Sequence, residues 1–402
     1  MNISHRIVRV FQPLFSATLI VLLAVVATSS VASASPEKSE SSRYIIVFKS
    51  GIDESAKSDA VGRAGAEKVK NLGLINAQAV LVTSVGQVDK LRGDKQVLRV
   101  DPDVEVTIAA RKGGSGATQP VEVTPWGINR IDAEIAWPAT TGAGVKVGII
   151  DTGIDLNHPD LKSNIKGGFN AITQRKSAAD DNGHGTHVAG TVAGIDNAIG
   201  VIGVSPDVSL YAIKVLGANG SGYLSDVIEG IQWAVAQNMN IINMSLGTSV
   251  NIESLHDAVI AANAAGVVIV AAAGNSGSAL LYPAAYPETI AVGATDITDS
   301  IAPFSNRGTG LDLVAPGVDI FSTYKGSAYA TLTGTSMASP HVAGTAALVL
   351  STPVGASDVN FNGRWDPAEV FSKLISTATD LGPTGFDTDS GYGLVNAAAA
   401  VE

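Results

Sequence analysis

From about residue 125 onward, short runs of β-branched residues alternate with alanine-rich stretches that have the spacing of helices. This alternation is typical of βαβ units, in which helices connect parallel strands and cover both faces of one sheet. The sequence therefore predicts an α/β fold with a parallel sheet flanked by helices. The expected strands are 145–150, 210–215, 241–244 and 267–272, and the expected helices are 184–194, 224–237, 252–265 and 336–350.

The N-terminus of the 402-residue chain has a different character. Basic and histidine side chains before residue 10 precede an apolar run over 14–27, and small residues end at Ala34. This is the pattern of a secretory signal peptide over 1–34. A membrane anchor is the alternative, but the apolar run is shorter than the roughly 20 residues that a spanning helix needs. We therefore expect a secreted, extracellular protein with no membrane contact after removal of the signal.

The composition narrows the choice of partners. A net charge of -11 argues against a nucleic-acid binder, which needs clustered lysine and arginine to neutralise phosphates. The chain contains no cysteine, although disulfides are the usual cross-links of exported proteins. Bound metal cations are an alternative source of stability, so they are the partners that the composition favours.

Residues 43–108 are expected to form a small α+β unit ahead of the main sheet. A polar, glycine-rich stretch at 111–116 follows and is typical of an exposed linker, where cleavage concentrates. The expected strands of the small unit are 44–48, 79–83 and 97–101, and its expected helices are 52–72 and 85–92. The predicted segments are a signal peptide at 1–34, the small unit with the start of the linker at 35–110, the linker at 111–121 and the main domain at 122–402.

Three short motifs carry groups suited to nucleophilic catalysis. Asp151 follows a predicted strand, His184 begins a predicted helix, and Ser336 begins another. Each motif alone is weak, since an Asp-Thr-Gly triplet also occurs in aspartic proteases and in plain turns. Together they reproduce the order Asp, His, Ser that one class of serine protease uses. A serine hydroxyl needs a histidine to take its proton, and an aspartate fixes that histidine's tautomer.

Asn275 follows the strand expected at 267–272 and is the candidate for a second function at the same edge. Its side-chain amide could donate a hydrogen bond to the negative oxygen that forms when a peptide carbonyl is attacked. Ser336, at the first turn of a helix, would supply backbone N–H groups for the same oxygen.

The segments 147–155, 182–190 and 334–344 resemble the signature blocks of the subtilisin family, and the resemblance extends from about Pro125 to the end of the chain. It implies a serine endopeptidase with Asp151, His184 and Ser336 as its triad and Asn275 in the oxyanion hole. The small unit resembles the family's inhibitory propeptide, which implies self-cleavage between Ala109 and Val121. A monomer that acts on proteins and peptides is expected, with its own propeptide as intramolecular inhibitor.

The resemblance also implies where a substrate binds. An extended peptide would pair with two exposed backbone edges, which are Gly220, Ser221, Gly222 and Ser245, Leu246, Gly247. Side-chain preference would come from a pocket that includes Gly274, with Leu281 at its floor. Because this pocket has no acidic residue, we expect broad, apolar-leaning specificity rather than selection for lysine or arginine.

Two segments are candidates for binding calcium, which prefers six to eight oxygen ligands. The loop 194–201 resembles the family's strong calcium loop; a glycine turn with a solvated asparagine is the alternative. The ligands that the resemblance implies are Glu122, Asp160, Asn197 and the carbonyls of Ile195, Ile199 and Val201. The second segment, 358–369, has oxygen side chains spaced as in an EF-hand loop, although an ordinary Asn- and Asp-rich turn is possible. Its candidate ligands are Asp358, Asn360, Asn362, the carbonyl of Arg364, Asp366 and Glu369.

Two rival functions make different predictions for the same motifs. A catalytically inactive binding protein on this fold would lack a triad residue, and all three are present. An acid-acting sedolisin relative would have glutamate where His184 stands. The other histidines of the signature blocks, such as His187 and His341, are expected to be structural.

Overall fold

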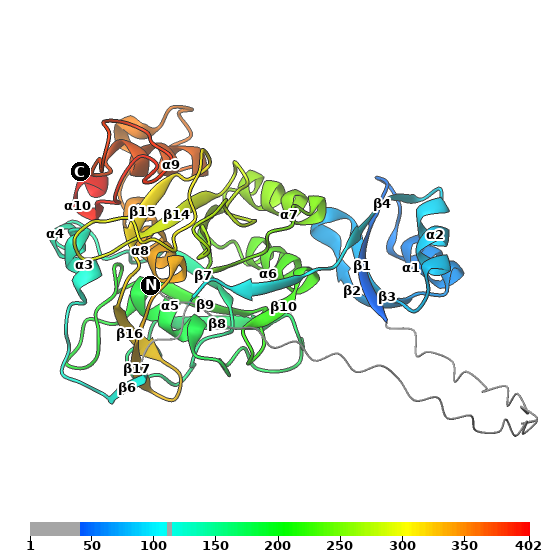
Figure 1. The fold of residues 1–402 in the computed structure, drawn as a ribbon, viewed down its shortest axis with the longest axis horizontal. Helices are drawn as coiled ribbons and strands as arrows, with labels where there is room; N and C mark the ends of the chain where they lie inside the picture. The colour runs from blue at the N-terminus through cyan, green and yellow to red at the C-terminus, as the bar shows by residue number, and fades with distance from the viewer. Residues whose placement is uncertain (1–40, 111–114) are drawn as a thin grey trace, which may run out of the picture. The chain divides into compact units, whose positions relative to one another are not determined.

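The computed structural model describes residues 41–110 and 115–402, so the predicted signal peptide lies outside the described residues. The main sheet has seven strands in the order β15-β14-β13-β11-β7-β9-β8, and every pairing in it is parallel (Figure 1). This confirms the predicted parallel sheet. In chain order the strands are β7 (Lys146–Asp151), β8 (Ile165–Asn170), β9 (Ser209–Lys214), β11 (Ile241–Met244), β13 (Val268–Ala272), β14 (Ile290–Thr295) and β15 (Leu313–Pro316).

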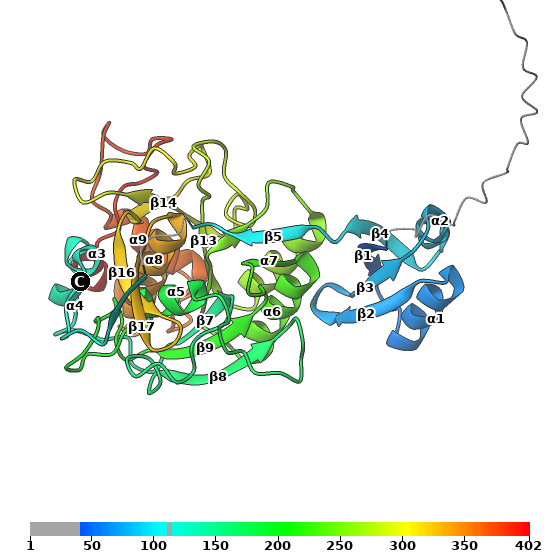
Figure 2. The same ribbon diagram turned by 60° about the horizontal axis from the view of Figure 1, so that its bottom comes forward.

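Helices cover both faces of this sheet, as predicted. Helices α5 (His184–Ala193) and α8 (Thr335–Leu350) pack on one face, and α6 (Leu224–Ala236) and α7 (Glu253–Ala264) pack on the other (Figure 2). The central strands are therefore buried on both sides, which explains their nearly continuous apolar sequences. Helix α8 is buried from Thr335 to Val349, so small residues at its many contacts are required.

Three strands of the main sheet were missing from the sequence prediction. Strand β8 contains Gly167 and Gly168, and a Cβ at Gly168 would lie 2.7 Å from the carbonyl oxygen of Ala212 on β9. The close approach of the two backbones requires glycine, and this residue type hides a strand in the sequence pattern. Strands β14 and β15 are short apolar segments that periodicity alone does not separate from buried loops.

The small N-terminal unit is an antiparallel sheet in the order β2-β3-β1-β4 with two helices. The helix predicted over 52–72 is wrong in its second half. Gly65 adopts a left-handed conformation with φ 78° and ends the helix, and the next residues form an edge strand. The elements are β1 (Ser42–Phe48), α1 (Glu54–Ala64), β2 (Glu67–Leu72), the 3-10 turn η1 (Gly73–Ile75), β3 (Ala77–Val82), α2 (Val85–Gly93) and β4 (Val97–Pro102).

One face of the small sheet packs on its own helices, and the other face packs on α6 and α7. Lys70 of β2, which is buried, pairs with Asp226 and lies 2.9 Å from Glu229, both on α6. Asp103 accepts hydrogen bonds from the backbone N–H and the hydroxyl of Ser225, each at 2.8 Å, at the start of α6. Burial raises the pKa of Asp103, and Arg43 opposes that rise. Apolar packing and paired charges therefore hold the unit on these helices.

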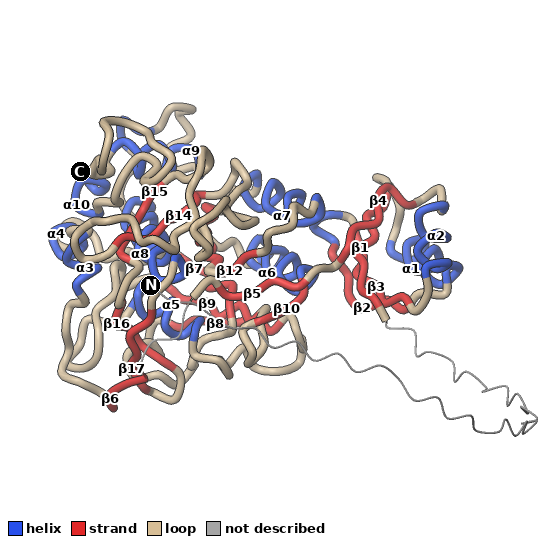
Figure 3. The backbone as a smooth tube through the Cα atoms, in the orientation of Figure 1, coloured by secondary structure: helices blue, strands red, loops and turns tan. Residues whose placement is uncertain are grey.

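Two short sheets pair the chain around the linker with the main domain, and Figure 3 shows them as strand segments beside long loops. Strand β5 (Glu105–Ile108) pairs between β10 (Ser221–Tyr223) and β12 (Leu246–Gly247). In the predicted linker, β6 (Ser115–Thr118) pairs with β17 (Ala328–Leu332), so the linker is not wholly irregular. The remaining elements are α3 (Trp126–Arg130), α4 (Ala133–Ala136), β16 (Ile320–Tyr324), η2 (Gly355–Ser357), α9 (Pro367–Ser376) and α10 (Ala397–Val401). Among the helices of the described residues, none is long and apolar enough to cross a membrane.

Candidate active site

Asp151 and His184 form a buried hydrogen-bonded pair. Asp151 is the last residue of β7, and His184 is the first residue of α5. The Nδ1 atom of His184 lies 2.8 Å from Oδ1 and 3.0 Å from Oδ2 of Asp151. A carboxylate can only accept here, so Nδ1 carries the proton and Nε2 keeps its lone pair. The geometry makes His184 an acceptor at Nε2, as a general base requires.

Ser336 is the second residue of α8 and is fully buried. Its hydroxyl donates a hydrogen bond to the carbonyl oxygen of Ser245 at 3.0 Å. Its backbone N–H donates to the carbonyl oxygen of Ala109 at 3.2 Å. Among the described residues, the buried Nε2 of His184 has no hydrogen-bond partner, so transfer of the Ser336 proton to it requires rotation of the hydroxyl.

Asn275 is oriented by the residue next to Ser336. Its Oδ1 accepts hydrogen bonds from the backbone N–H of Thr335 at 2.9 Å and from the Thr335 hydroxyl at 3.1 Å. This leaves Nδ2 as a buried donor without a partner among the described residues. A Cβ at Gly334 would lie 2.7 Å from the carbonyl oxygen of Ala109 and 3.1 Å from Asn275 Nδ2. The two atoms therefore border one small space, which the lack of a side chain at Gly334 keeps open.

Strand β5 lies across the edges that were expected to hold a substrate. Ser221 and Gly222 pair with β5 from one side, and Leu246 and Gly247 pair with it from the other. The N–H of Ile108 donates to the carbonyl of Gly220 at 3.0 Å. The N–H of Ala109 donates to the carbonyl of Ser245 at 3.2 Å. All six predicted edge residues thus contact the protein's own chain on the N-terminal side of Ala109.

Leu281 lies between the two backbone walls of the predicted pocket. A Cβ at Gly247 would lie 2.8 Å from Cβ of Leu281, and a Cβ at Gly274 would lie 2.7 Å from its Cγ. The backbone N–H of Leu281 donates to the carbonyl of Ala273 at 2.9 Å. The leucine side chain therefore fills space directly against both walls. A cleft of about 290 Å³ continues past Ala110, between His184 and Leu332.

The predicted first calcium site brings together three of its expected side chains. Buried Asp160 accepts hydrogen bonds from Nδ2 of Asn197 at 2.7 Å and from the N–H of Val201 at 2.9 Å. Glu122 accepts from the N–H of Asn197 at 2.6 Å. Asn197 also contacts the carbonyl of Ile195 at 3.0 Å and the N–H of Ile199 at 2.8 Å.

The electrostatics of this loop fit a cation. Burial raises the pKa of Asp160 to about 6, and the charge of Glu122 contributes to the rise. Two carboxylates, an amide and backbone carbonyls are the oxygen donors that calcium prefers. The described residues nevertheless contain no group of three or more His, Cys, Asp or Glu arranged for a metal, so the site depends on neutral oxygens.

In the segment 358–369, each carboxylate accepts hydrogen bonds from the protein itself. Asp358 accepts from the N–H groups of Asn362 and Gly363, and Asp366 accepts from the side-chain amides of Asn360 and Asn362. Glu369 accepts from the N–H groups of Val359 and Asp366, each at 2.9 Å, in a capping box that begins α9. The N–H of Arg364 donates to Asn362. The segment forms a tight turn around the side chains of Asp358 and Asn360, as the expected loop would. Its calcium binding stays a prediction.

His187 and His341, which were expected to be structural, are both fully buried. Burial lowers the pKa of His187 to about 3 and that of His341 to about 4. The Nε2–H of His187 donates to the carbonyls of Ile320 and Ala330, each at 3.0 Å. A functional residue that sequence reasoning missed is Thr335, which orients Asn275. Thr335 directly precedes Ser336 in the segment 334–344, and this position was the only sign in the sequence that it could contribute to the site.

Comparison with known proteins agrees with this geometry. The subtilase family model matches residues 142–393. An alkaline protease of Alkalihalobacillus alcalophilus is 42% identical over 397 residues, which cover 96% of this chain and 97% of that protein. Subtilisin Savinase of Lederbergia lenta is 50% identical over 278 residues, 69% of this chain and 98% of its own. Subtilisin E of Bacillus subtilis (strain 168) is 40% identical over 399 residues, 97% of each chain. The chain belongs to the subtilase family of serine endopeptidases.

Proposed function

We propose that this chain is made as a secreted precursor that cuts itself between Ala109 and Ala110 and then hydrolyses proteins with Asp151, His184 and Ser336. The observation that carries the proposal is the hydrogen bond from the Ser336 N–H to the Ala109 carbonyl. That contact supports a catalytic serine next to one specific peptide bond of its own chain. The pairing of β5 with β10 and β12 supports the same alignment, in which Ala109 lies at Ser336.

The cleavage follows the usual chemistry of such a triad. The Ser336 oxygen attacks the Ala109 carbonyl carbon, and its proton passes to Nε2 of His184. Asp151 holds the other ring nitrogen and stabilises the imidazolium. The negative oxygen of the tetrahedral intermediate accepts from the Ser336 N–H and Asn275 Nδ2. His184 then gives the proton to the nitrogen of Ala110, which leaves, and a water molecule hydrolyses the Ser336 acyl ester in the same manner.

Residues 35–109 act as the inhibitory propeptide in this proposal, and Ala110 becomes the first residue of the linker. After the cut, β5 would still occupy the peptide-binding edges, so a product segment blocks the site until it dissociates. The packing of the small sheet on α6 and α7 supports a stable complex. Residues 1–34 act as the signal for export, residues 110–121 as the linker and residues 122–402 as the catalytic domain, which works as a monomer without nucleic-acid or membrane partners.

The precursor with Ser336→Ala should remain joined across residues 109 and 110. The parent should separate at that bond, because only the parent has the nucleophile. Intact-mass analysis of both purified precursors, with and without a serine-directed inhibitor, measures the cut and its position. Maturation of the variant at the parent's rate, with no other protease present, would show that the cleavage does not depend on Ser336.

Replacing Asn275 with Leu should lower kcat by roughly 100- to 1,000-fold with little change in KM, a magnitude known for loss of this donor in a subtilisin. Asn275 would act in the transition state, after the substrate has bound. Steady-state kinetics on a short peptide substrate give both constants, and the thermal unfolding temperature controls for damage to the fold. A change confined to KM would contradict the oxyanion role.

We further propose that specificity is broad and favours small to medium apolar side chains before the cut, with Leu281 setting the limit. Leu281→Gly should raise kcat/KM for phenylalanine relative to alanine at that position by about tenfold or more, because a larger side chain gains apolar burial. Leu280→Ala, at the adjacent position, is the matched control and should keep the parent's preference. A mixed peptide library read by mass spectrometry supplies the profile, and dominant cleavage after arginine or lysine would contradict the proposal.

Calcium is the proposed cofactor, and the loop 194–201 with Glu122 and Asp160 is its first site. When bound, the ion would neutralise the paired carboxylates and stabilise the folded state by mass action, by about 2.7 kcal/mol at 100 times its Kd. The segment 358–369 is the second proposed site. The spacing of its oxygen side chains and its left-handed Gly363, with φ 78°, support it.

Two variants separate these sites. Asp160→Asn should lose one bound calcium ion relative to the parent, and Asp358→Ala combined with Glu369→Ala should lose a different one. Ion counts on dialysed, inhibited protein are measured together with thermal unfolding at increasing calcium concentrations. If the double variant binds as many ions as the parent and keeps the same calcium-dependent protection, the segment 358–369 is not a metal site.

A further inference from the structure

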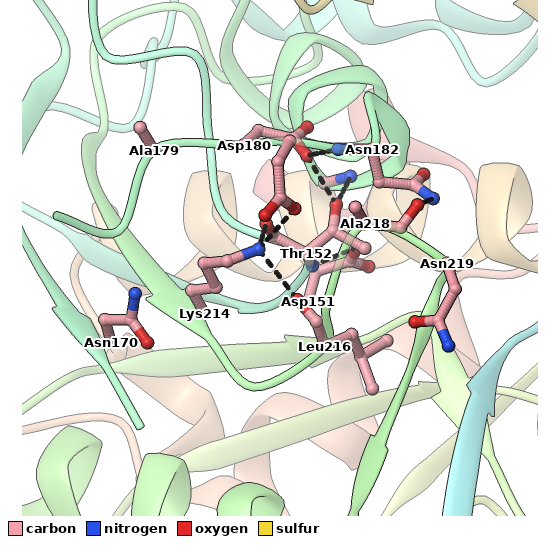
Figure 4. A network of polar contacts seen from close by, with 12 residues as sticks. Asp151, Thr152, Asn170, Ala179, Asp180, Asn182, Lys214, Leu216, Ala218 and Asn219 are labelled. Carbon is pink, nitrogen blue, oxygen red and sulfur yellow. Dashed lines mark hydrogen bonds and ion pairs between the residues drawn. The ribbon is translucent and has the colours of Figure 1, made fainter. Parts of the chain in front are cut away.

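The carboxylate of Asp180, in the loop before α5, accepts a hydrogen bond from Thr152, the residue next to Asp151 (Figure 4). Its Oδ1 accepts from the Thr152 hydroxyl and from the N–H groups of Asn182 and Gly183, each at 2.9 Å. Its Oδ2 accepts from the N–H of Thr186 at 3.0 Å and from the Thr186 hydroxyl at 2.6 Å. One side chain thus connects the end of β7 with the beginning of α5.

Thr152 extends this connection towards the catalytic histidine. Because its hydroxyl proton points to Asp180, its oxygen is free to accept the N–H of Gly185 at 2.9 Å. Gly185 follows His184 directly, just as Thr152 follows Asp151. A Cβ at Gly185 would lie 2.2 Å from the carbonyl oxygen of Gly153, so the two backbones are in direct contact there.

The start of α5 lacks a cap of its own. The N-cap residue is Gly183, with φ 112°, and the first turn contains no acidic residue. Helix N-termini have free N–H groups and favour negative charge. Asp180 supplies this negative charge from outside the helix. It accepts hydrogen bonds from the N–H groups of Gly183 and Thr186, which precede and follow His184 in the chain.

Lys214 holds the other side of Thr152. Its buried ammonium donates to the carbonyls of Thr152 at 2.7 Å and Leu216 at 2.8 Å, and to the exposed carboxylate of Asp181 at 2.6 Å. The residue after Asp151 is therefore fixed at its hydroxyl by a carboxylate and at its carbonyl by an ammonium.

We propose that Asp180 is a positioning residue of this enzyme, which acts through Thr152 to hold Asp151 and His184 in register for proton transfer. The inference rests on the proposed triad. Proton transfer through a histidine needs its ring at hydrogen-bond distance from both partners, and a displacement of about 1 Å can lower a rate about 100-fold. Asp180 touches neither substrate nor reacting atoms, so its effect should appear in kcat.

Two substitutions separate position from charge. Asp180→Asn removes the charge and replaces one acceptor oxygen with a donor. Thr152→Val removes only the hydroxyl that joins Asp180 to Gly185 and leaves every charge in place. Each should lower kcat about 10- to 100-fold, with KM within twofold of the parent. Thr152→Ser restores the hydroxyl and should recover most of the loss.

The pH profile of kcat/KM gives a second measure. The charged and titratable groups around His184 are Asp151, Asp180, Asp181, Lys214, the buried His187, and Tyr324 and Lys325, which line the same cleft. Removing the negative charge of Asp180 disfavours the imidazolium, so the acid limb should move to lower pH in Asp180→Asn. It should stay in place in Thr152→Val. If Asp180 served only folding, its loss would not lower kcat at constant KM, and it would not shift the acid limb of the pH profile.

Asp207→Asn is the matched control, because it removes the charge of an exposed carboxylate that bonds to Thr141 and to none of the residues that hold Thr152 or α5. Its kcat should stay within twofold of the parent. Because slow variants also mature slowly, the first-order rate of cleavage after Ala109 in each purified precursor is measured beside turnover, and it involves no substrate binding. Thermal unfolding shows whether each variant folds.

The outcomes distinguish this inference from the proposed function. One result would overturn the positioning role and leave the proposed triad in place. In that result Ser336→Ala abolishes both self-cleavage after Ala109 and substrate turnover, while Asp180→Asn and Thr152→Val keep kcat within twofold of the parent. Loss of kcat only in proportion to lost folded protein would also overturn the positioning role. If Ser336→Ala retains turnover, the proposed function itself is wrong.

Discussion

The parallel direction of the seven main strands determines where every reactive group of this protein lies. The carboxyl ends of parallel strands meet at one edge of a sheet, and each connecting helix begins at that same edge. Asp151 ends β7, Ser245 follows β11, and Asn275 follows β13; these three strands are neighbours. His184 and Ser336 begin α5 and α8, which lie together on one face. The site therefore forms from segments far apart in sequence without any unusual backbone path.

Two of the seven buried side-chain polar atoms that have no hydrogen-bond partner among the described residues belong to the candidate site. Most buried donors and acceptors in proteins are paired, and those that are not need an explanation. The two atoms are Nε2 of His184 and Nδ2 of Asn275. Neighbouring residues hold both side chains. Asp151 accepts a hydrogen bond from Nδ1 of His184, and the N–H of Thr335 donates to Oδ1 of Asn275. In the proposed mechanism, Nε2 of His184 takes the Ser336 proton, and Nδ2 of Asn275 donates to the negative oxygen.

The sequence alone predicted the parallel sheet, its four principal helices and the residues at the strand ends. Apolar runs indicate which segments are buried, and Gly-rich turns indicate where those segments end. It failed where a residue's partner was distant or its pattern ambiguous. The charged stretch 67–72 has helical spacing, yet it pairs with β3 as a strand and supplies Lys70 to α6. Strand β8 was hidden by its glycines. Asp180 lies in a polar loop, and its importance depends on Thr152, far away in sequence.

Hydrogen bonds hold the chain on both sides of the proposed cut. While Ala109 is still held at Ser336, residues 120–123 already lie along the loop 198–202. The N–H of Gly200 donates to Pro120, and the N–H of Val123 donates to Gly200. Residues 110–119 connect these two anchors, and β6 within this segment pairs with β17. Cutting after Ala109 would therefore release a tether without moving either anchor. The new N-terminal segment would then stay held at residues 120–123, on the candidate calcium loop, after the propeptide dissociates.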